Sequence, residues 1–323
     1  MINSSQTVIL SMKLKIRLKE KVLRVKQIPL PFGSHSLEQA LNRLRQLVQS
    51  LQNLGTKESN NLAQLLRTTF MAIMFAKLTK AVAKPRAFSL FEGFIDKSED
   101  PQTLAYLGLK AEDLILPHSH YRVKIFIKDP QIWQDFWQPK YILVFKGTGI
   151  LFLDDWENNI QQALGKESKY YQHAIKLAKA IVSAHKSAEV YAVGHSLGGG
   201  LATVFAMVSG AKAITYNAAG ISENTLMEAR YDCKNIDAYY VKGEALQALQ
   251  QKFSHQFHDL DIYRWHVNLS RIHPLPQSRG INHIVTAGLT SLDKHFVRTV
   301  IRGLNKQLLS LEQQALKLIN VKR

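Results

Sequence analysis

Cysteine is almost absent from this chain: Cys233 is the only one in 323 residues, so no disulfide can form within it. A fold without disulfides is typical of a protein made in a reducing compartment. Long apolar runs are also missing, because the most apolar stretch, residues 70–78, is too short to span a bilayer. No apolar segment precedes the basic run at residues 13–26. We therefore expect a cytoplasmic protein, or one exported by a route that needs no signal peptide.

Acidic residues are scarce beside basic ones: 25 Asp and Glu stand against 42 Lys and Arg, which gives a formal net charge of +17. A field of this size attracts polyanions. The chain has no zinc-ligand spacing and no aromatic-rich RNA-binding pattern, and its cations are spread along its whole length. The charge therefore favours an anionic membrane surface over nucleic acid as a partner. It does not indicate an oligomeric state.

Strands that alternate with helices are predicted in the second part of the chain. The predicted strands cover residues 122–127, 141–145, 190–193, 211–216 and 236–241, and helices are expected at 168–185 and from 293 to about 318. This order predicts an α/β fold with a largely parallel sheet covered by helices on both faces. Residues 1–115 are predicted to form a basic, mostly helical extension or cap, with helices over 37–54 and 61–83. We therefore divide the chain into 1–115 and 116–323.

The sequence GHSLGGG at residues 194–200 is the most informative motif in the chain. An apolar strand precedes it and an apolar helix follows it. A serine raised on such a tight turn needs glycine two residues away on either side, because a Cβ there would collide with the opposing backbone. The turn also directs backbone N–H groups toward a negatively charged oxygen. We predict that Ser196 is a nucleophile; the alternative is a glycine-rich turn with an uninvolved serine.

A serine nucleophile needs a base to accept its proton and a carboxylate to hold that base. In α/β-hydrolase sheets these groups follow in the order serine, acid, histidine, at the carboxyl ends of strands. Glu244 comes directly after the predicted strand 236–241 and is our preferred acid. Asp259 and Asp261 in a later loop, and Asp237 inside the strand, remain alternatives.

Several histidines after the predicted acid could serve as the base. His295, at the start of the last predicted helix behind an Asp293 cap, is preferred because that position holds a side chain at the sheet edge. His283, in a predicted turn before an apolar run, is the close competitor. The remaining candidates are His255, His258, His266 and His273.

An oxyanion needs two hydrogen-bond donors. The backbone N–H of Leu197, directly after the serine, is the first candidate. The second candidate is Thr148, because residues 146–149 (KGTG) follow the predicted strand 141–145 and their glycines permit a close approach. A plain turn is the alternative interpretation of these residues.

Three motifs together, VFKGT at 144–148, DW and NN within 155–159, and GHSLGG at 194–199, resemble the class 3 lipases. These form the fungal-lipase-like branch of the α/β-hydrolase fold, which includes bacterial phospholipase A1-type proteins. The resemblance covers residues 120 to 303. It implies a triad with Ser196 as nucleophile, an oxyanion residue at Thr148, and hydrolysis of lipid carboxylic esters without a metal or other cofactor. The segment from His295 onward resembles the family's last histidine and helix, whereas the family usually has Asp where this chain offers Glu244.

The residues and the resemblance together predict a serine esterase of the phospholipase A1 type that works through an acyl-enzyme. A role as an exported, membrane-damaging effector is a further hypothesis. Two rivals remain: a short-chain esterase, thioesterase or peptidase on the same fold, and a non-catalytic basic module that binds membranes.

Overall fold

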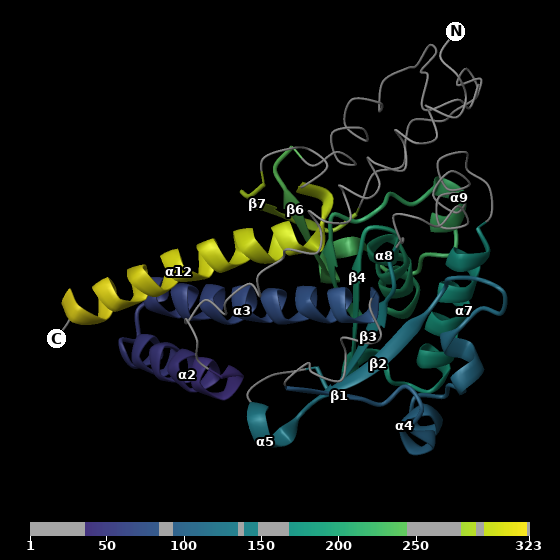
Figure 1. Cartoon of the computed structure of the whole chain (residues 1–323), viewed down its shortest axis with the longest axis horizontal. Coiled ribbons are helices and arrows are strands. Elements are labelled where there is room, and N and C mark those ends of the chain that lie inside the picture. Colours follow the sequence, from purple (N-terminus) through teal and green to yellow (C-terminus); the bar gives the residue numbers. More distant parts are fainter. Residues whose placement is uncertain are drawn as a thin grey trace, which may run out of the picture.

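A computed structural model describes residues 36–83, 93–134, 139–147, 168–243, 279–288 and 294–321. Its centre is a seven-stranded sheet in which the strands follow one another in sequence order (Figure 1). The first three strands pair antiparallel, and the third to the seventh pair parallel. The predicted α/β class with a largely parallel sheet is confirmed. The strands are β1 (Phe94–Asp96), β2 (Val123–Lys128), β3 (Tyr141–Phe145), β4 (Val190–His195), β5 (Lys212–Tyr216), β6 (Ile236–Val241) and β7 (Ile281–Val285).

The helices fall close to the predicted ranges. Ser36 caps the first one, since its hydroxyl accepts from the N–H of Gln39 while the Gln39 side chain accepts from the N–H of Ser36. The α-helices are α2 (Leu37–Asn53), α3 (Lys57–Ala83), α4 (Pro101–Tyr106), α5 (Pro130–Trp133), α7 (Lys169–Ser183), α8 (Leu197–Ser209), α9 (Glu223–Leu226) and α12 (Val297–Val321). Short 3₁₀ helices cover Ala111–Leu114, Ser187–Glu189 and Cys233–Asn235.

Two predictions at the end of the chain need correction. The segment around His283 is not a turn but the edge strand β7, paired in parallel with β6. Four of its five residues are at least partly exposed, including Ile281 and Ile284, so its apolar residues do not alternate with polar ones as in a half-buried strand. The regular part of α12 begins at Val297, so His295 lies just before that helix. The predicted cap, Asp293, is outside the described residues.

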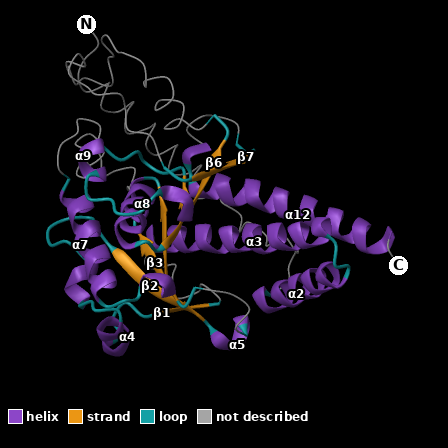
Figure 2. Cartoon of the chain, turned by 180° about the vertical axis from the view of Figure 1, so that it is seen from behind, coloured by secondary structure: helices purple, strands orange, loops and turns teal. Residues whose placement is uncertain are grey.

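Helices cover both faces of the sheet. Helices α3 and α12 lie side by side on one face with α2 beside them, while α7 and α8 lie on the other (Figures 1 and 2). Apolar side chains of α2, α3 and α12 share one core with the strands, and those of α7 and α8 share a second core. The Tyr216 hydroxyl of β5 donates to the carbonyl of Ala72 in α3, 2.5 Å away, which ties the first face together. The division of the chain at residue 115 stays a prediction, although β1 already belongs to the sheet.

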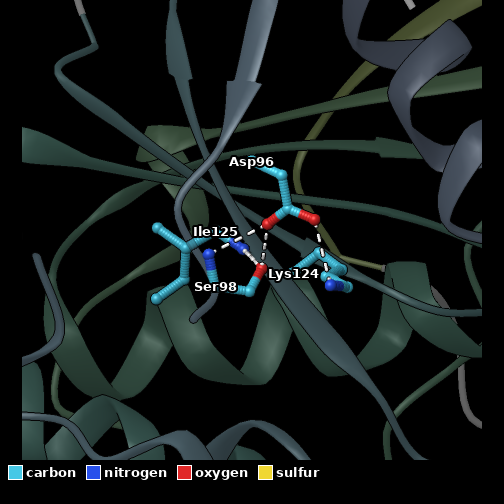
Figure 3. Close-up of polar contacts among 4 residues, drawn as sticks. All are labelled: Asp96, Ser98, Lys124 and Ile125. Carbon is cyan, nitrogen blue, oxygen red and sulfur yellow. Dashed lines mark hydrogen bonds and ion pairs between the residues drawn. The ribbon is translucent and has the colours of Figure 1, made fainter. Parts of the chain in front are cut away.

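A small polar cluster holds the edge strand β1 against β2 (Figure 3). One carboxylate oxygen of Asp96 accepts from the backbone N–H and the hydroxyl of Ser98, and the other lies 2.9 Å from Lys124 Nζ. The Ser98 hydroxyl in turn accepts from the N–H of Ile125. These contacts compensate for a strand of only three residues, whose own ladder provides little stability. They also explain why no apolar pattern in the sequence revealed β1.

Candidate active site

Ser196 occupies a sharp turn between β4 and α8, in the middle of the sheet. Its backbone has φ +57° and ψ −125°, a conformation that a non-glycine residue adopts only when its surroundings impose it. The surroundings do so here: the Ser196 N–H donates to the carbonyl of Tyr216, and the Ser196 carbonyl accepts from the N–H groups of Gly199 and Ala219. The predicted strand, turn and helix around this serine are confirmed.

Glycines make this turn possible because backbone segments lie in direct contact around it. A Cβ on Gly194 would overlap the carbonyl oxygen of Gly198, and a Cβ on Gly198 would overlap the carbonyl oxygen of Phe145. A third glycine reaches the turn from β3: a Cβ on Gly147 would overlap the carbonyl oxygen of His195. The end of β3 therefore lies directly against the turn that carries Ser196.

The side chain of His295 meets that of Ser196. The distance from His295 Nε2 to Ser196 Oγ is 3.0 Å, although the two residues are 99 positions apart in the sequence. In a neutral imidazole, Nε2 can accept the hydroxyl proton. The Ser196 side chain is buried, which limits competition from water. The structure thus brings together the predicted nucleophile and the preferred predicted base.

Two polar side chains, the partly buried His195 and the buried Asn217, hold the main chain of His295. His195 Nε2 lies 2.7 Å from the carbonyl oxygen of His295. Asn217 Nδ2 lies 2.9 Å from the carbonyl oxygen of Lys294 and 3.0 Å from that of His295. The other end of the Asn217 amide accepts from the N–H of Val241, at 3.0 Å. The base is therefore tied to the carboxyl ends of β4, β5 and β6.

The protonation state of His195 follows from its surroundings. Burial, together with the nearby His295 ring, lowers its pKa to about 3, although the hydrogen bond to the His295 carbonyl acts in the opposite direction. The ring is therefore neutral at pH 7. Because a carbonyl oxygen can only accept, the proton of this neutral ring must be on Nε2.

His283, the alternative base, is bound elsewhere. Its Nε2 lies 2.8 Å from Asp237 Oδ1, and its ring stacks on Tyr239 with the centroids 4.6 Å apart. Asp237, the weakest of the candidate acids, is thus the partner of His283 within the sheet. Among the described residues no contact joins either side chain to Ser196.

Eight candidate site residues lie outside the described residues: Thr148, Glu244, His255, His258, Asp259, Asp261, His266 and His273. The structure does place the neighbours of two of them. Gly147, before Thr148, contacts the turn at Ser196, and Gly243, before Glu244, follows the carboxyl end of β6. The N–H of Leu197 is in the first turn of α8, where no carbonyl of the same helix can accept from it.

The supporting roles of His195 and Asn217 were not predicted from the sequence. His195 is part of the GHSLG motif, but only its contact with the distant His295 carbonyl shows its role. Asn217 carried a weaker signal: a polar residue directly after the apolar strand β5. Its φ of +41° is a second sign, visible only in the structure.

The described part of the chain has neither a membrane-spanning helix nor a cluster of metal ligands. None of its helices combines the length and apolar character that a bilayer crossing requires. No group of three or more His, Cys, Asp or Glu side chains there is arranged to hold a metal ion.

The sheet and the raised serine beside a histidine define an α/β-hydrolase. Residues 76–275, more than half of the chain, match the Tle-like phospholipase domain, and the chain belongs to this phospholipase-like family. The match begins within α3, ahead of the predicted boundary at residue 116. The narrower resemblance to class 3 lipases stays a prediction.

One of the proteins similar to this chain is itself named as a phospholipase. "Extracellular phospholipase A1" of Serratia liquefaciens is 33% identical over 183 residues, which are 54% of this chain and 53% of that protein. The chain thus spans about half the length of this relative. A solved structure described as a "predicted CIB-like hydrolase" from Thermoplasma acidophilum aligns with 59% of this chain and 93% of its own, at 14% identity. Its TM-score of 0.28 is too low to establish a shared fold.

Proposed function

We propose that this protein is a serine esterase that hydrolyses carboxylic esters of lipids, in the manner of a phospholipase A1. The observation that carries the proposal is the 3.0 Å contact between Ser196 Oγ and His295 Nε2 at a raised strand-to-helix turn. Membership of the phospholipase-like family and the similarity to a phospholipase A1 favour lipid esters over other acyl substrates.

Acylation would start from this pair. Ser196 Oγ forms a bond to the ester carbonyl carbon while its proton moves to His295 Nε2, and the carbonyl oxygen becomes an oxyanion. The bond between the carbonyl carbon and the glycerol oxygen then breaks. The proton on Nε2 passes to the glycerol oxygen, and the lysophospholipid leaves. The acyl chain stays on Ser196 as an ester.

Deacylation repeats these steps with water. Water gives a proton to His295 Nε2 and attacks the acyl carbonyl carbon, and the bond to Ser196 Oγ breaks. Oγ recovers its proton from Nε2, and the fatty acid leaves. Both half-reactions need the imidazole at the same place, which the contacts of His195 and Asn217 with the backbone at residue 295 support.

The remaining roles belong to residues next to the described site. We assign the oxyanion donors to the N–H of Leu197 and to Thr148, because Gly147 lies against the turn and Leu197 begins α8. We assign the acid to Glu244, because Gly243 follows the carboxyl end of β6, the position at which this fold carries its acid. Asp259 and Asp261 are the alternatives to be tested beside it.

The enzyme would bind its substrate at the surface of a lipid bilayer. The net charge of +17 favours adsorption to anionic bilayers, at about 1 kcal/mol for each cation near the headgroups. This attraction would raise the local substrate concentration without taking part in the bond-breaking steps.

The test of the function is hydrolysis of phosphatidylglycerol vesicles, with the products identified by mass spectrometry. The proposal expects a free fatty acid and a 2-acyl lysophospholipid from the wild type, and loss of both with Ser196→Ala and with His295→Ala. His283→Ala is the matched histidine control and should keep most of the activity. Turnover of short-chain esters or thioesters alone would favour a small-substrate esterase. Vesicle binding without any turnover would favour a non-catalytic membrane module.

A further inference from the structure

A cavity of about 580 Å³ lies where β6 and β7 end and α12 begins. Its walls include the backbone of Gly243 after β6 and the residues after β7. Among the described residues, every charged side chain that lines it is cationic. These side chains come from two separate stretches of the chain, the residue after β6 and the start of α12 with the residues before it, and are Lys242, Lys294, Arg302 and Lys306.

This grouping of like charges lacks compensation within the described residues. No ion pair there joins any of the four cations to an acidic side chain. Arg302 and Lys306 are four residues apart on α12, a spacing at which like charges repel across one turn of helix. Like charges gathered at the wall of a cavity repel one another, and an anion that joins them lowers the free energy. The cavity therefore offers a favourable position to an anion.

Lys294 connects the wall of the cavity to the catalytic pair along the chain. This residue directly precedes His295, and Asn217 binds the carbonyl oxygens of both. The Lys294 ammonium group reaches into the cavity beside Gly243, where a Cβ would lie 3.3 Å from its Nζ. The segment that delivers the histidine to Ser196 thus also delivers a cation to the cavity.

We propose that this cavity binds the phosphate of the lipid headgroup while the acyl ester lies at Ser196. The inference rests on the proposed function and adds to it the subsite, with its residues, that holds the phosphate close to the scissile bond. In a glycerophospholipid only the glycerol carbons separate these two groups, so a phosphate site must border the catalytic pair. Arg302 offers the planar, two-pronged donor that suits phosphate, and the lysines add charge at its rim.

The first experiment measures binding apart from turnover. Dihexanoyl phosphatidylglycerol, held below its critical micelle concentration, is titrated calorimetrically into the Ser196→Ala protein, so that attraction to a membrane plays no part. Inorganic phosphate is titrated separately and then used as a competitor. The proposal expects saturable lipid binding that phosphate weakens by competition. Binding of inorganic phosphate without any binding of the lipid would identify a free-phosphate site and overturn the headgroup assignment.

The variants then test the cavity itself. Arg302→Gln combined with Lys306→Gln removes two exposed cations of α12 without touching a buried group. Lys57→Gln combined with Lys317→Gln removes two exposed cations elsewhere and serves as the control. In the Ser196→Ala background, the first pair should weaken lipid binding about tenfold, as expected for lost charge-assisted contacts. The control pair should change it less than about twofold.

Kinetics separate this inference from the proposed function. In proteins that retain Ser196, the ratio of kcat/KM for dihexanoyl phosphatidylglycerol to kcat/KM for 4-nitrophenyl butyrate should fall about tenfold with Arg302→Gln/Lys306→Gln. An equal fall in this ratio with the control pair would show that the net positive charge of the whole protein, and not the cavity, favours the phospholipid. This result would overturn the inference. If the wild type hydrolyses neither ester, the proposed function fails, while the titrations still decide whether the cavity binds the phosphate.

Discussion

His195 Nε2 donates a hydrogen bond to the carbonyl oxygen of His295, 2.7 Å away, so the residue before the nucleophile holds the main chain of the histidine that contacts it. Asn217 binds the same carbonyl from β5. Nucleophile and base therefore share one support at the carboxyl ends of β4 and β5. A change in that support alters their separation without removing either of them.

His195→Ala should lower kcat about 10²-fold with little change in KM, because a base displaced by about 1 Å no longer accepts the serine proton efficiently. His195→Gln should recover a large part of this loss, since its amide nitrogen can donate from nearly the same place. Steady-state kinetics on a soluble ester measure both effects. If Ala and Gln at this position reduce kcat equally, the hydrogen bond to His295 does not position the base.

The His195 ring should also be silent in the pH dependence of the rate. Its folded pKa of about 3 is depressed below the ordinary value of 6.5, so it is uncharged from about pH 5 upward. The pH–rate profile of the Gln variant should therefore have the same shape as that of the wild type between pH 5 and 9. In that comparison, a titration step present only in the wild type would show that His195 takes up a proton in this range.

The low pKa of His195 also makes the stability of the folded protein depend on pH. Because the unfolded chain takes up a proton on this histidine below pH 6.5 and the folded chain does not until about pH 3, stability falls as the pH falls through that window. Denaturant unfolding at pH 7 and pH 5 should show a smaller decrease in the free energy of unfolding for His195→Gln than for the wild type. An equal decrease in both proteins would contradict the assignment.

Asn217→Ala should reduce both stability and activity. It leaves the buried N–H of Val241 and the carbonyls at residues 294 and 295 without this partner, at a cost of about 3 kcal/mol. The loss of kcat should be less than additive with that of His195→Ala, because both side chains hold the same carbonyl. A double-mutant cycle in kcat measures this coupling. Strictly additive losses would show that His195 and Asn217 act on the histidine independently.

Gly147→Ala should greatly reduce ester hydrolysis, since its Cβ would overlap the carbonyl oxygen of His195 and push the end of β3 away from the turn. Gly55→Ala is the matched control. Its φ of +66° makes alanine cost about 1 kcal/mol of stability, but nothing lies within 4 Å of the new methyl group and activity should persist. Full activity in Gly147→Ala would contradict the contact between β3 and the turn.

Glu312 on α12, remote from the active site, should make the stability of the protein depend on pH. Burial raises its pKa from 4.5 to about 7, although Arg43 on α2 lies 3.8 Å away and acts in the opposite direction. The folded protein thus holds a proton that the unfolded chain has lost, and stability decreases as the pH rises from about 4.5 to 7. Glu312→Gln should remove this decrease, about 1–3 kcal/mol in the free energy of unfolding. The control Glu38→Gln, at an exposed position on α2, should retain it.

The parts of the fold that the sequence could predict are those that carry local patterns. The central strands show apolar runs, and the turn at Ser196 shows glycines at the positions where a Cβ would collide with the opposing backbone. His295 was preferred from its place at the start of the last predicted helix, and in the structure its Nε2 lies 3.0 Å from Ser196 Oγ. β1 and β7 were missed because their stability comes from partners, such as the contacts of Asp96 with Ser98 and Lys124, and not from their own pattern. The support by Asn217 was missed for the same reason: its partners are 77 and 78 residues away.

Covalent labelling of the active serine tests the central claim most directly. The intact protein is treated with a fluorophosphonate probe, digested, and mapped by mass spectrometry. We predict one modified peptide, with the probe on Ser196 Oγ, no labelling of Ser196→Ala, and strongly reduced labelling of His295→Ala but not of His283→Ala. Labelling that persists in Ser196→Ala, or lipid hydrolysis unchanged in that variant, would contradict the account.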